Sequence, residues 1–432
     1  MPPHDPIALG ASLPLWSVVP FAGLLLSIAL FPLFAPSVWA RHYAKVCLAF
    51  GVPVACFFLL RAPRELLHTT LEYASFLILL ASLFTISGGI LLRGTLRGSA
   101  GVNCAILAVG ALLANVFGTT GASMLLIRPL LRANAHRRRA AHVVVFFIFV
   151  VANIGGALTP IGDPPLFLGY LRGVPFFWTL RAMVLPWAFA CALVIGAFYL
   201  VDRRALALEK VAAAEDEGDP ARAGAPDTVA GAGEARVPLS IEGKINLPLL
   251  MVVIGAVFLP TPWREMAMAA AAGVSAWKTP AKVRKENEFT WYPIEEVAIL
   301  FAGIFATMIP ALLILKARGA ELGVVSPAHF FWVTGTLSSF LDNAPTYLTF
   351  FSLAQGVGGA ETVAGVSAPL LQAISAGAVF MGANSYIGNA PNFMVKAIAE
   401  EAGVRMPSFF GYMAWSCGIL LPIFALLTLI FF

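Results

Sequence analysis

Two aspartates are the residues in this 432-residue sequence whose position most clearly points to chemistry. Asp163 lies inside the apolar stretch 143–170, and Asp342 lies inside the apolar stretch 328–353, whereas the other acidic residues fall in loops, at segment edges or in a polar stretch. An ionised carboxylate at membrane depth is costly unless it is hydrated, paired or protonated, so such a residue indicates a functional site. Burial favours the protonated carboxyl and a nearby cation favours the charged one. Each aspartate can therefore hold either H⁺ or Na⁺, although an Asp that merely caps a half-helix is the alternative.

Side chains with neutral oxygen atoms lie close to both aspartates in the sequence. Oxygen ligands of this kind suit hard cations. We predict that the proton or cation is bound by Asp163, Asp342, Asn343 and Asn389, with Na⁺ at the two aspartates. The supporting residues are Gly118, Thr119, Thr120, Thr159, Pro160, Gly162, Pro345, Thr346, Asn384, Ser385, Gly388 and Asn392. Hydroxyl groups in membrane helices often bond only to their own backbone, so a structural role is the alternative for each of these.

The segments that carry these residues are predicted to be interrupted helices. Pro removes a backbone donor and Gly weakens a helix, which leaves backbone groups unpaired at membrane depth. Such groups are tolerated where protein buries them or where they line a watery cavity, and there the carbonyls can bind cations and the N–H groups of half-helix starts can bind anions. A proline-kinked packing helix is the simpler interpretation of one such segment. Four of them in two matched pairs favour a transport site.

The interruptions belong to an internal repeat with an offset of 226 residues. GALTPIGDPPLF at 156–167 aligns with GANSYIGNAPNF at 382–393, with six identities in twelve positions. This alignment makes Asn389 the counterpart of Asp163. A second interruption precedes each motif, at 118–121 in the first half and at 341–346 in the second. The order of apolar segment, interrupted segment, second interrupted segment and closing segment therefore occurs twice.

Composition indicates the class of protein that holds these segments. Hydrophobic residues make up 59% of the chain and charged residues only 12%, whereas a soluble domain has about 25% charged residues. Runs of about 20 apolar residues are long enough to cross a bilayer as helices. We therefore predict an all-α polytopic membrane protein with lipid as its surroundings, and neither a soluble enzyme nor a nucleic-acid-binding protein. The apolar segments fall at 15–34, 42–60, 71–92, 103–131, 143–170, 178–201, 245–260, 264–277, 294–315, 328–353, 370–398 and 411–432.

The basic residues predict the topology. If 103–131 and 328–353 are re-entrant hairpins and every other apolar segment crosses once, one side collects 20 Lys and Arg and the other 7, against 17 and 10 if both hairpins cross. The positive-inside rule favours the first arrangement and assigns the side with 20 to the cytoplasm. Both termini then face outward. The run from His136 to Arg139 is interpreted as a cytoplasmic anchor near anionic lipid.

This topology divides the chain into five parts and inverts the second repeat relative to the first, as in many secondary transporters. Residues 1–70 form N-terminal transmembrane helices. Repeat 1 spans 71–201, with the hairpin 103–131 and the broken helix 143–170. A cytoplasmic linker rich in Ala, Gly, Pro and charge spans 202–244, and connecting helices span 245–293. Repeat 2 spans 294–432, with the hairpin 328–353 and the broken helix 370–398.

The motifs NIGGALTPIGD at 153–163 and LDNAP at 341–345 resemble those of the ion transporter superfamily, which includes NhaD-type sodium/proton antiporters, citrate and dicarboxylate carriers and arsenite permeases. The likeness covers about 71–201 and 294–432. It implies two re-entrant hairpins with tips at 118–121 and 342–346, facing breaks at 159–165 and 384–391, cation sites between them, and a homodimer. Carboxylate carriers of the superfamily typically have Ser-Asn-Thr at the tips, and this chain has Gly-Thr-Thr and Asn-Ala-Pro instead. The second break, from Gly388 to Asn392, is more similar to that of a carboxylate carrier.

Together these observations predict a secondary transporter of the inner membrane that exchanges Na⁺ for H⁺ through Asp163 and Asp342. Cation-coupled uptake of a small carboxylate such as citrate, bound by half-helix N-termini and by Asn and Thr side chains, is the alternative. A non-transporting scaffold or receptor gives no reason for four paired breaks. No Walker motif is present, and we expect no enzymatic activity and no cofactor, with Na⁺ and H⁺ as the transported or coupling ions.

Overall fold

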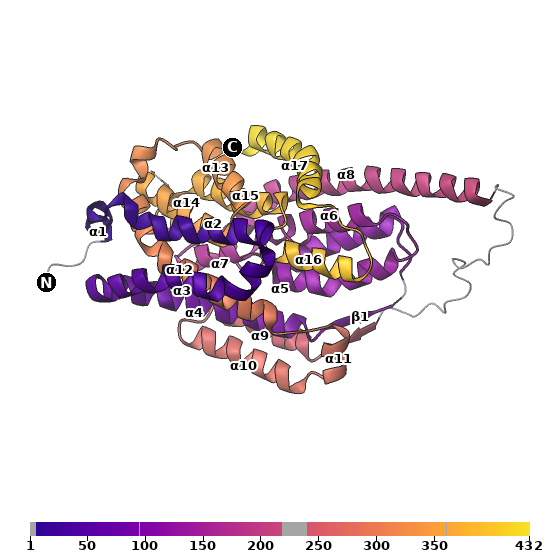
Figure 1. The fold of residues 1–432 in the computed structure, drawn as a ribbon, viewed down its shortest axis with the longest axis horizontal. Helices are drawn as coiled ribbons and strands as arrows, with labels where there is room; N and C mark the ends of the chain where they lie inside the picture. The colour runs from indigo at the N-terminus through magenta and orange to yellow at the C-terminus, as the bar shows by residue number, and fades with distance from the viewer. Residues whose placement is uncertain (1–5, 95, 218–239, 360) are drawn as a thin grey trace.

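The computed structural model describes residues 6–94, 96–217, 240–359 and 361–432. Helices dominate, and the only strands in these ranges form two short antiparallel pairs, β1 with β2 and β3 with β4. Eight segments in the described ranges are long and apolar enough to cross a membrane. The protein is therefore an all-α polytopic membrane protein, as the composition predicts. Figure 1 shows most helices running along the long axis of the molecule.

The first half of the chain contains the following elements: α1 Pro6–Ser12, η1 Leu15–Val18, α2 Val19–Phe34, α3 Pro36–Arg61, α4 Pro63–Ser87, β1 Leu91–Arg93, α5 Ala100–Ala133, α6 Ala141–Val150, η2 Ile154–Leu158, α7 Pro164–Leu171 and α8 Phe176–Glu217. The second half contains β2 Ser240–Glu242, α9 Asn246–Ala256, α10 Trp263–Lys278, α11 Ala281–Glu286, α12 Tyr292–Arg318, η4 Gly319–Leu322, α13 Pro327–Ser338, α14 Asn343–Val357, β3 Thr362–Val363, β4 Val366–Ser367, α15 Ala368–Met381, η5 Gly382–Asn384, α16 Ala390–Glu401 and α17 Phe409–Phe431.

The interrupted segments divide at the residues that weaken a helix. Gly118, inside α5, has φ 74° and ψ 158°, a backbone conformation open to Gly and strained for other residues. Pro164 begins α7 at the first helical position, where its missing N–H costs nothing. Non-helical residues likewise separate α13 from α14 and α15 from α16. Whether the two hairpins re-enter the membrane, and the five-part division of the chain, stay predictions.

Part of the predicted linker 202–244 is helical. Helix α8 continues through this stretch to Glu217, and Figure 1 shows it extending past the bundle. The residues from 202 to 217 are rich in Ala, Leu, Glu, Lys and Arg, which are good helix formers, so low hydrophobicity alone does not end the helix. At the other end of the predicted linker, β2 pairs with β1. Residues 218–239 lie outside the described residues.

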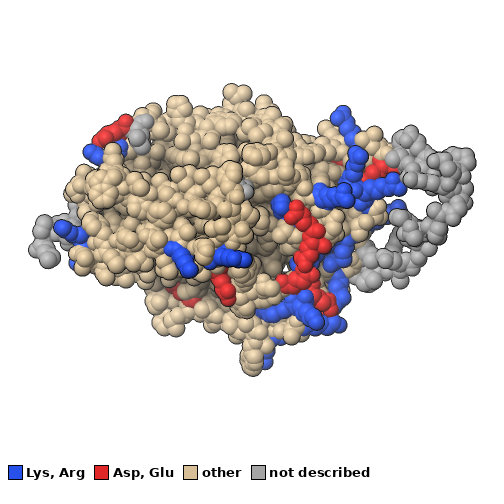
Figure 2. Space-filling view, in the orientation of Figure 1, with Lys and Arg blue, Asp and Glu red and all other residues tan. Residues whose placement is uncertain are grey.

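One arginine of the β1–β2 pair makes two ion pairs. Arg93 Nε lies 2.6 Å from Glu242 Oε1, and Arg93 also pairs with Glu286 at the end of α11. The hydrogen bonds that the Arg93 guanidinium donates to the carboxylates of Glu286 and Glu242 raise its pKa. The strand pair thus joins the α4–α5 connection, which contains β1, to the residues just before α9. Figure 2 shows charged side chains gathered towards this end of the molecule, while the rest of the visible surface is largely uncharged.

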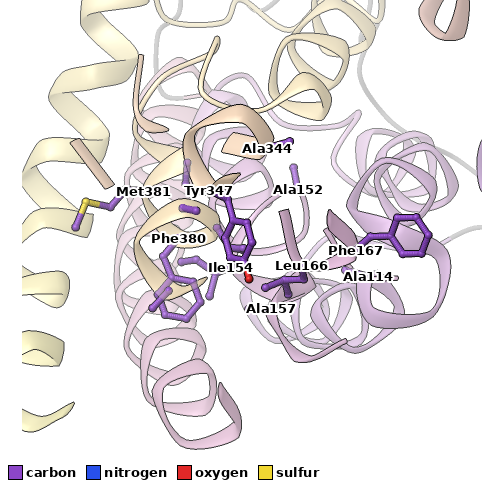
Figure 3. Close-up of a cluster of buried hydrophobic side chains, with 14 of the residues drawn as sticks. Ala114, Ala152, Ile154, Ala157, Leu166, Phe167, Ala344, Tyr347, Phe380 and Met381 are labelled. Atoms are coloured by element: carbon purple, nitrogen blue, oxygen red, sulfur yellow. The ribbon is translucent and has the colours of Figure 1, made fainter. Parts of the chain in front are cut away.

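The core lies where the interrupted helices pack together. Helices α13 and α15 pack against each other, α14 packs against α7 and α15, and α12 packs against α3, α4 and α14. Figure 3 shows part of the resulting cluster, to which Ile154 of η2, Leu166 of α7, Tyr347 of α14 and Phe380 of α15 contribute. This packing brings the two repeats into contact at their breaks.

Candidate functional site

Asp163 is at the centre of the candidate site. Its side chain is 1% exposed and accepts three hydrogen bonds. Thr119 Oγ1 donates to Oδ1 at 2.7 Å, Asn389 Nδ2 donates to the same oxygen at 3.2 Å, and Asn343 Nδ2 donates to Oδ2 at 2.5 Å. All three partners are neutral. The two counterparts in the repeat, Asp163 and Asn389, therefore meet in space.

The backbone of the first half positions Asp163. Thr119 N, just after the break in α5, donates to Gly162 O at 2.8 Å. Asn115, one turn earlier in α5, donates to Gly155 O at 2.7 Å and accepts from Leu158 N at 2.8 Å. These bonds satisfy backbone groups that the broken helix leaves free. The break in α5 and the break between α6 and α7 are thus fixed as one unit.

The second half contains a comparable unit. Asn384 Nδ2 donates to Ser339 Oγ at 2.9 Å, and Ser385 Oγ donates to Ser339 O. Asn392 Nδ2 donates to Gly382 O and to Ser385 O, each at 2.8 Å. These bonds join the residues before α14 to the break between α15 and α16. Asn343 and Asn389, which face Asp163, lie in these two segments.

Asp342 differs from Asp163 in its surroundings. It is half-buried, and its Oδ1 accepts from Ala344 N at 3.0 Å, so it is the N-cap of α14. A carboxylate is favoured at a helix N-terminus because it satisfies a free N–H and complements the helix dipole. Asp342 also lines the same cavity as Asp163. The capping role and an ion-binding role are therefore compatible at this residue.

A cavity of about 870 Å³, including its opening to solvent, adjoins the two aspartates. Its polar wall contains Thr119, Thr120, Asp163, Asp342 and Asn389. Helices α4 and α12 supply apolar lining residues: Phe76, Leu79, Leu80, Leu83, Phe84, Val297 and Phe301. No Lys, Arg or His is among the residues that line it. The ionisable groups among its lining residues are the carboxyls of Asp163 and Asp342.

One hydrogen-bond acceptor beside Asp163 has no donor. Asn343 is fully buried, its Nδ2 donates to Asp163, and its Oδ1 is buried without a hydrogen-bond partner. Asn384 Oδ1 is in the same situation near Ser339. Buried polar atoms are normally paired, so an orphan oxygen next to a carboxylate fits a missing positively charged partner. Carboxylate and amide oxygens are the donors that Na⁺ and similar hard cations take.

The remaining predicted site residues divide into two groups. Gly118, Thr120, Pro160 and Gly162 line the cavity. The others have structural contacts: Thr159 Oγ1 donates to Asn115 O at 2.7 Å, and Thr346 Oγ1 donates to Asp342 O at 2.9 Å. Pro345 and Gly388 are not among the residues that line the cavity. At Gly388 a Cβ atom would meet Ser338 O at 2.7 Å, so the close approach of two backbones requires a Gly here.

Asn115 and Asn153 are missing from the predicted site. Asn153 is fully buried between the two breaks and contacts both Asn389 and Asn392. Its position inside the motif at 153–163 was a signal, because an Asn in an apolar run needs partners for its amide. A buried Asn with partners more than 200 residues away cannot be recognised from spacing alone.

A buried charged cluster was also missed. Asp202, expected in the linker, is fully buried on α8 and accepts from Arg137 Nη1 at 2.5 Å and from Asn103 Nδ2 at 3.2 Å. His142 Nε2 lies 2.8 Å from the same carboxylate. Arg137 is therefore more than the lipid-facing anchor that the basic run 136–139 indicates. A charge this deep needs such partners, and the cluster lies away from the cavity residues.

Comparison with known proteins gives one family. Residues 10–432 match the family described as "Putative citrate transport". A search of curated proteins finds no match.

Proposed function

The chain belongs to this family of citrate-type transporters, and from that premise we propose that it moves its substrate by binding a cation, Na⁺ or H⁺, at Asp163. One observation carries the proposal: a carboxyl group that is 1% exposed has three neutral donors, and no ion pair to it occurs among the described residues. A buried carboxyl without a basic partner is neutralised either by a proton or by a metal cation.

Exchange of Na⁺ for H⁺ is the first candidate for this cation-dependent transport. The groups at the polar wall can bind a cation through carboxylate, hydroxyl and amide oxygens, and the unpartnered Asn343 Oδ1 adds a ligand. Proton and Na⁺ would compete for the same carboxylate, so that loading from one side and release to the other couples the two ions. Asp342 would supply the second titrating carboxyl. A cavity without any basic residue offers a free anion no counter-charge.

Cation-coupled transport of a small carboxylate such as citrate is the second candidate, and the family match favours it. The helices α7, α14 and α16 all begin at residues beside the cavity, namely after Asp163, Asp342 and Asn389. Helix N-termini favour anions. In this reading the cation at the aspartates neutralises the site first, and the carboxylate binds afterwards or enters as a cation complex.

Purified protein in proteoliposomes with an internal pH dye tests both candidates. Proton movement on addition of Na⁺ alone supports exchange, and movement that requires citrate supports carboxylate transport. The Asp163→Asn variant is expected to abolish either signal. A dye response that is the same in wild type and in Asp163→Asn would refute the assignment of the cation to this residue. We also propose that the protein is a homodimer in the inner membrane with both termini outside, which the resemblance and the distribution of basic residues support.

A further inference from the structure

A relay of amide groups connects the two breaks, and its direction is fixed at one end by backbone carbonyls. Asn392 Nδ2 donates to Gly382 O and Ser385 O, each at 2.8 Å, so the Asn392 amide nitrogen must point to these carbonyls. Its Oδ1 therefore points the other way and accepts from Asn153 Nδ2 at 2.7 Å. A carbonyl oxygen can only accept, so neither amide can be turned over without setting acceptor against acceptor.

The relay continues to Asp163. Asn153 Nδ2 also donates to Ile148 O at 2.8 Å, which leaves Asn153 Oδ1 as an acceptor. Asn389 Nδ2 lies 3.2 Å from this oxygen, 3.1 Å from Ala152 O and 3.2 Å from Asp163 Oδ1. The nitrogen of the Asn389 amide, rather than its oxygen, is therefore turned towards the carboxyl.

We propose that Asn153 is a positioning residue for the cation site: it fixes the orientation of the Asn389 amide and thereby the hydrogen bond that the amide nitrogen donates to Asp163 Oδ1. The inference rests on the proposed binding of a cation at Asp163. Asn153 and Asn392 are fully buried and Asn389 is 2% exposed, so no bulk water competes for these bonds. Asn153 lies on the first break and Asn389 and Asn392 on the second, so the relay joins the two repeats.

The orientation of the Asn389 amide matters because the two ends have opposite effects on Asp163. The nitrogen donates to Asp163 Oδ1 and holds the carboxylate in place. Without Asn153 the amide keeps only one of its two fixed acceptors, Ala152 O, so its orientation is less firmly held. An amide oxygen turned towards Asp163 would set acceptor against acceptor and displace the carboxylate.

The test is Na⁺ binding to the purified full-length protein, measured as the Na⁺ concentration that half-maximally raises its thermal stability. We expect Asn153→Ala to weaken apparent Na⁺ affinity about tenfold, as for the loss of one hydrogen bond to a charged group. Because Asn153 acts through Asn389, the double variant Asn153→Ala/Asn389→Ala should bind Na⁺ no more weakly than Asn389→Ala alone. Additive losses in the double variant would overturn the inference.

Two further variants separate positioning from a purely structural role. Asn246, equally buried, donates to Gly89 O and Gly243 O away from the cavity, so Asn246→Ala should lower stability without Na⁺ and leave Na⁺ affinity unchanged. Asn153→Ser, which retains a donor for Ile148 O but does not reach Asn389, replaces the Ala variant if that one does not fold.

The outcomes distinguish this inference from the proposed function. Suppose that wild type binds Na⁺ and that Asp163→Asn abolishes this binding. If Asn153→Ala then retains wild-type affinity, the positioning role is wrong and the proposed site stands. If Asp163→Asn binds Na⁺ like wild type, or wild type does not respond to Na⁺, the proposed Na⁺ site fails and the positioning role fails with it.

Discussion

Replacement of Asp163 by Asn and by Ala should have the same effect on transport and different effects on stability. Three buried donors point at this carboxyl: Thr119 Oγ1 and Asn389 Nδ2 at one oxygen, and Asn343 Nδ2 at the other. In Asp163→Ala, Thr119 Oγ1 and Asn343 Nδ2 lose their acceptor, whereas Asn389 Nδ2 keeps Ala152 O and Asn153 Oδ1. A buried donor left unpaired costs about 1–3 kcal/mol, and the adjoining cavity can admit water, so the lower figure applies and the total is about 2 kcal/mol.

Asp163→Asn keeps an acceptor for most of these donors. The new amide oxygen can still accept from Thr119 and Asn389, and the new NH₂ group then faces Asn343. The Asn343 amide can turn over because its Oδ1 has no partner to lose, and that oxygen accepts from the new NH₂. Burial of a charge is also avoided, so we expect the free energy of unfolding to stay within about 1 kcal/mol of wild type.

Thermal unfolding in detergent and transport in proteoliposomes check this prediction together. The Ala variant should unfold several degrees lower than wild type and the Asn variant should not, while both give only background transport. If Asp163→Asn is as unstable as Asp163→Ala, the hydrogen-bond account is wrong. If Asp163→Asn transports like wild type, the carboxyl does not carry the exchanged charge.

Three other predictions follow from the geometry. Gly118→Ala should lower the free energy of unfolding by about 1–3 kcal/mol and lower the melting temperature, because φ is 74° at this residue. Transport should fall as well, because Thr119, which contacts Asp163, follows directly. An unchanged melting temperature would refute the predicted backbone strain. Glu72→Gln should lower the free energy of unfolding by about 2–3 kcal/mol, because Arg172 Nη2 donates to Glu72 Oε2 at 3.0 Å and the Arg172 side chain is only 16% exposed. In thermal unfolding, an Arg172→Gln/Glu72→Gln double variant should lose less stability than the sum of the two single variants. A cysteine at position 215, in a background without native cysteines, should react with impermeant reagent only from the cytoplasm, and labelling only from outside would overturn the topology.

The Asp202 cluster illustrates why a composition-based boundary misses buried charge. Residues 202–217 are polar enough to be predicted as linker, yet α8 continues through them and buries Asp202 against Arg137 and His142. The partners lie 65 and 60 residues away in the chain. Hydrophobicity within a window cannot reveal that an isolated acidic residue will be neutralised by a distant base.

The sequence by itself determined the class of the protein and the residues at which its helices break. Apolar length decides whether a helix can cross a bilayer, and the positive φ of Gly118 and the missing N–H of Pro164 are properties of single residues, so both can be recognised locally. The importance of Asp163 also follows from its own surroundings in the sequence.

Only the tertiary structure decided which side chains meet at that carboxyl. Asn343 and Asn389 reach Asp163 from 180 and 226 residues away, Asp342 caps its own helix beside them, and Asn153 joins the two breaks. These contacts depend on how the interrupted helices of the two repeats pack, and packing is a property of the whole set of buried surfaces rather than of any one segment. The repeat alignment made Asp163 and Asn389 equivalent; their contact arises because the two breaks are packed against each other in the folded chain.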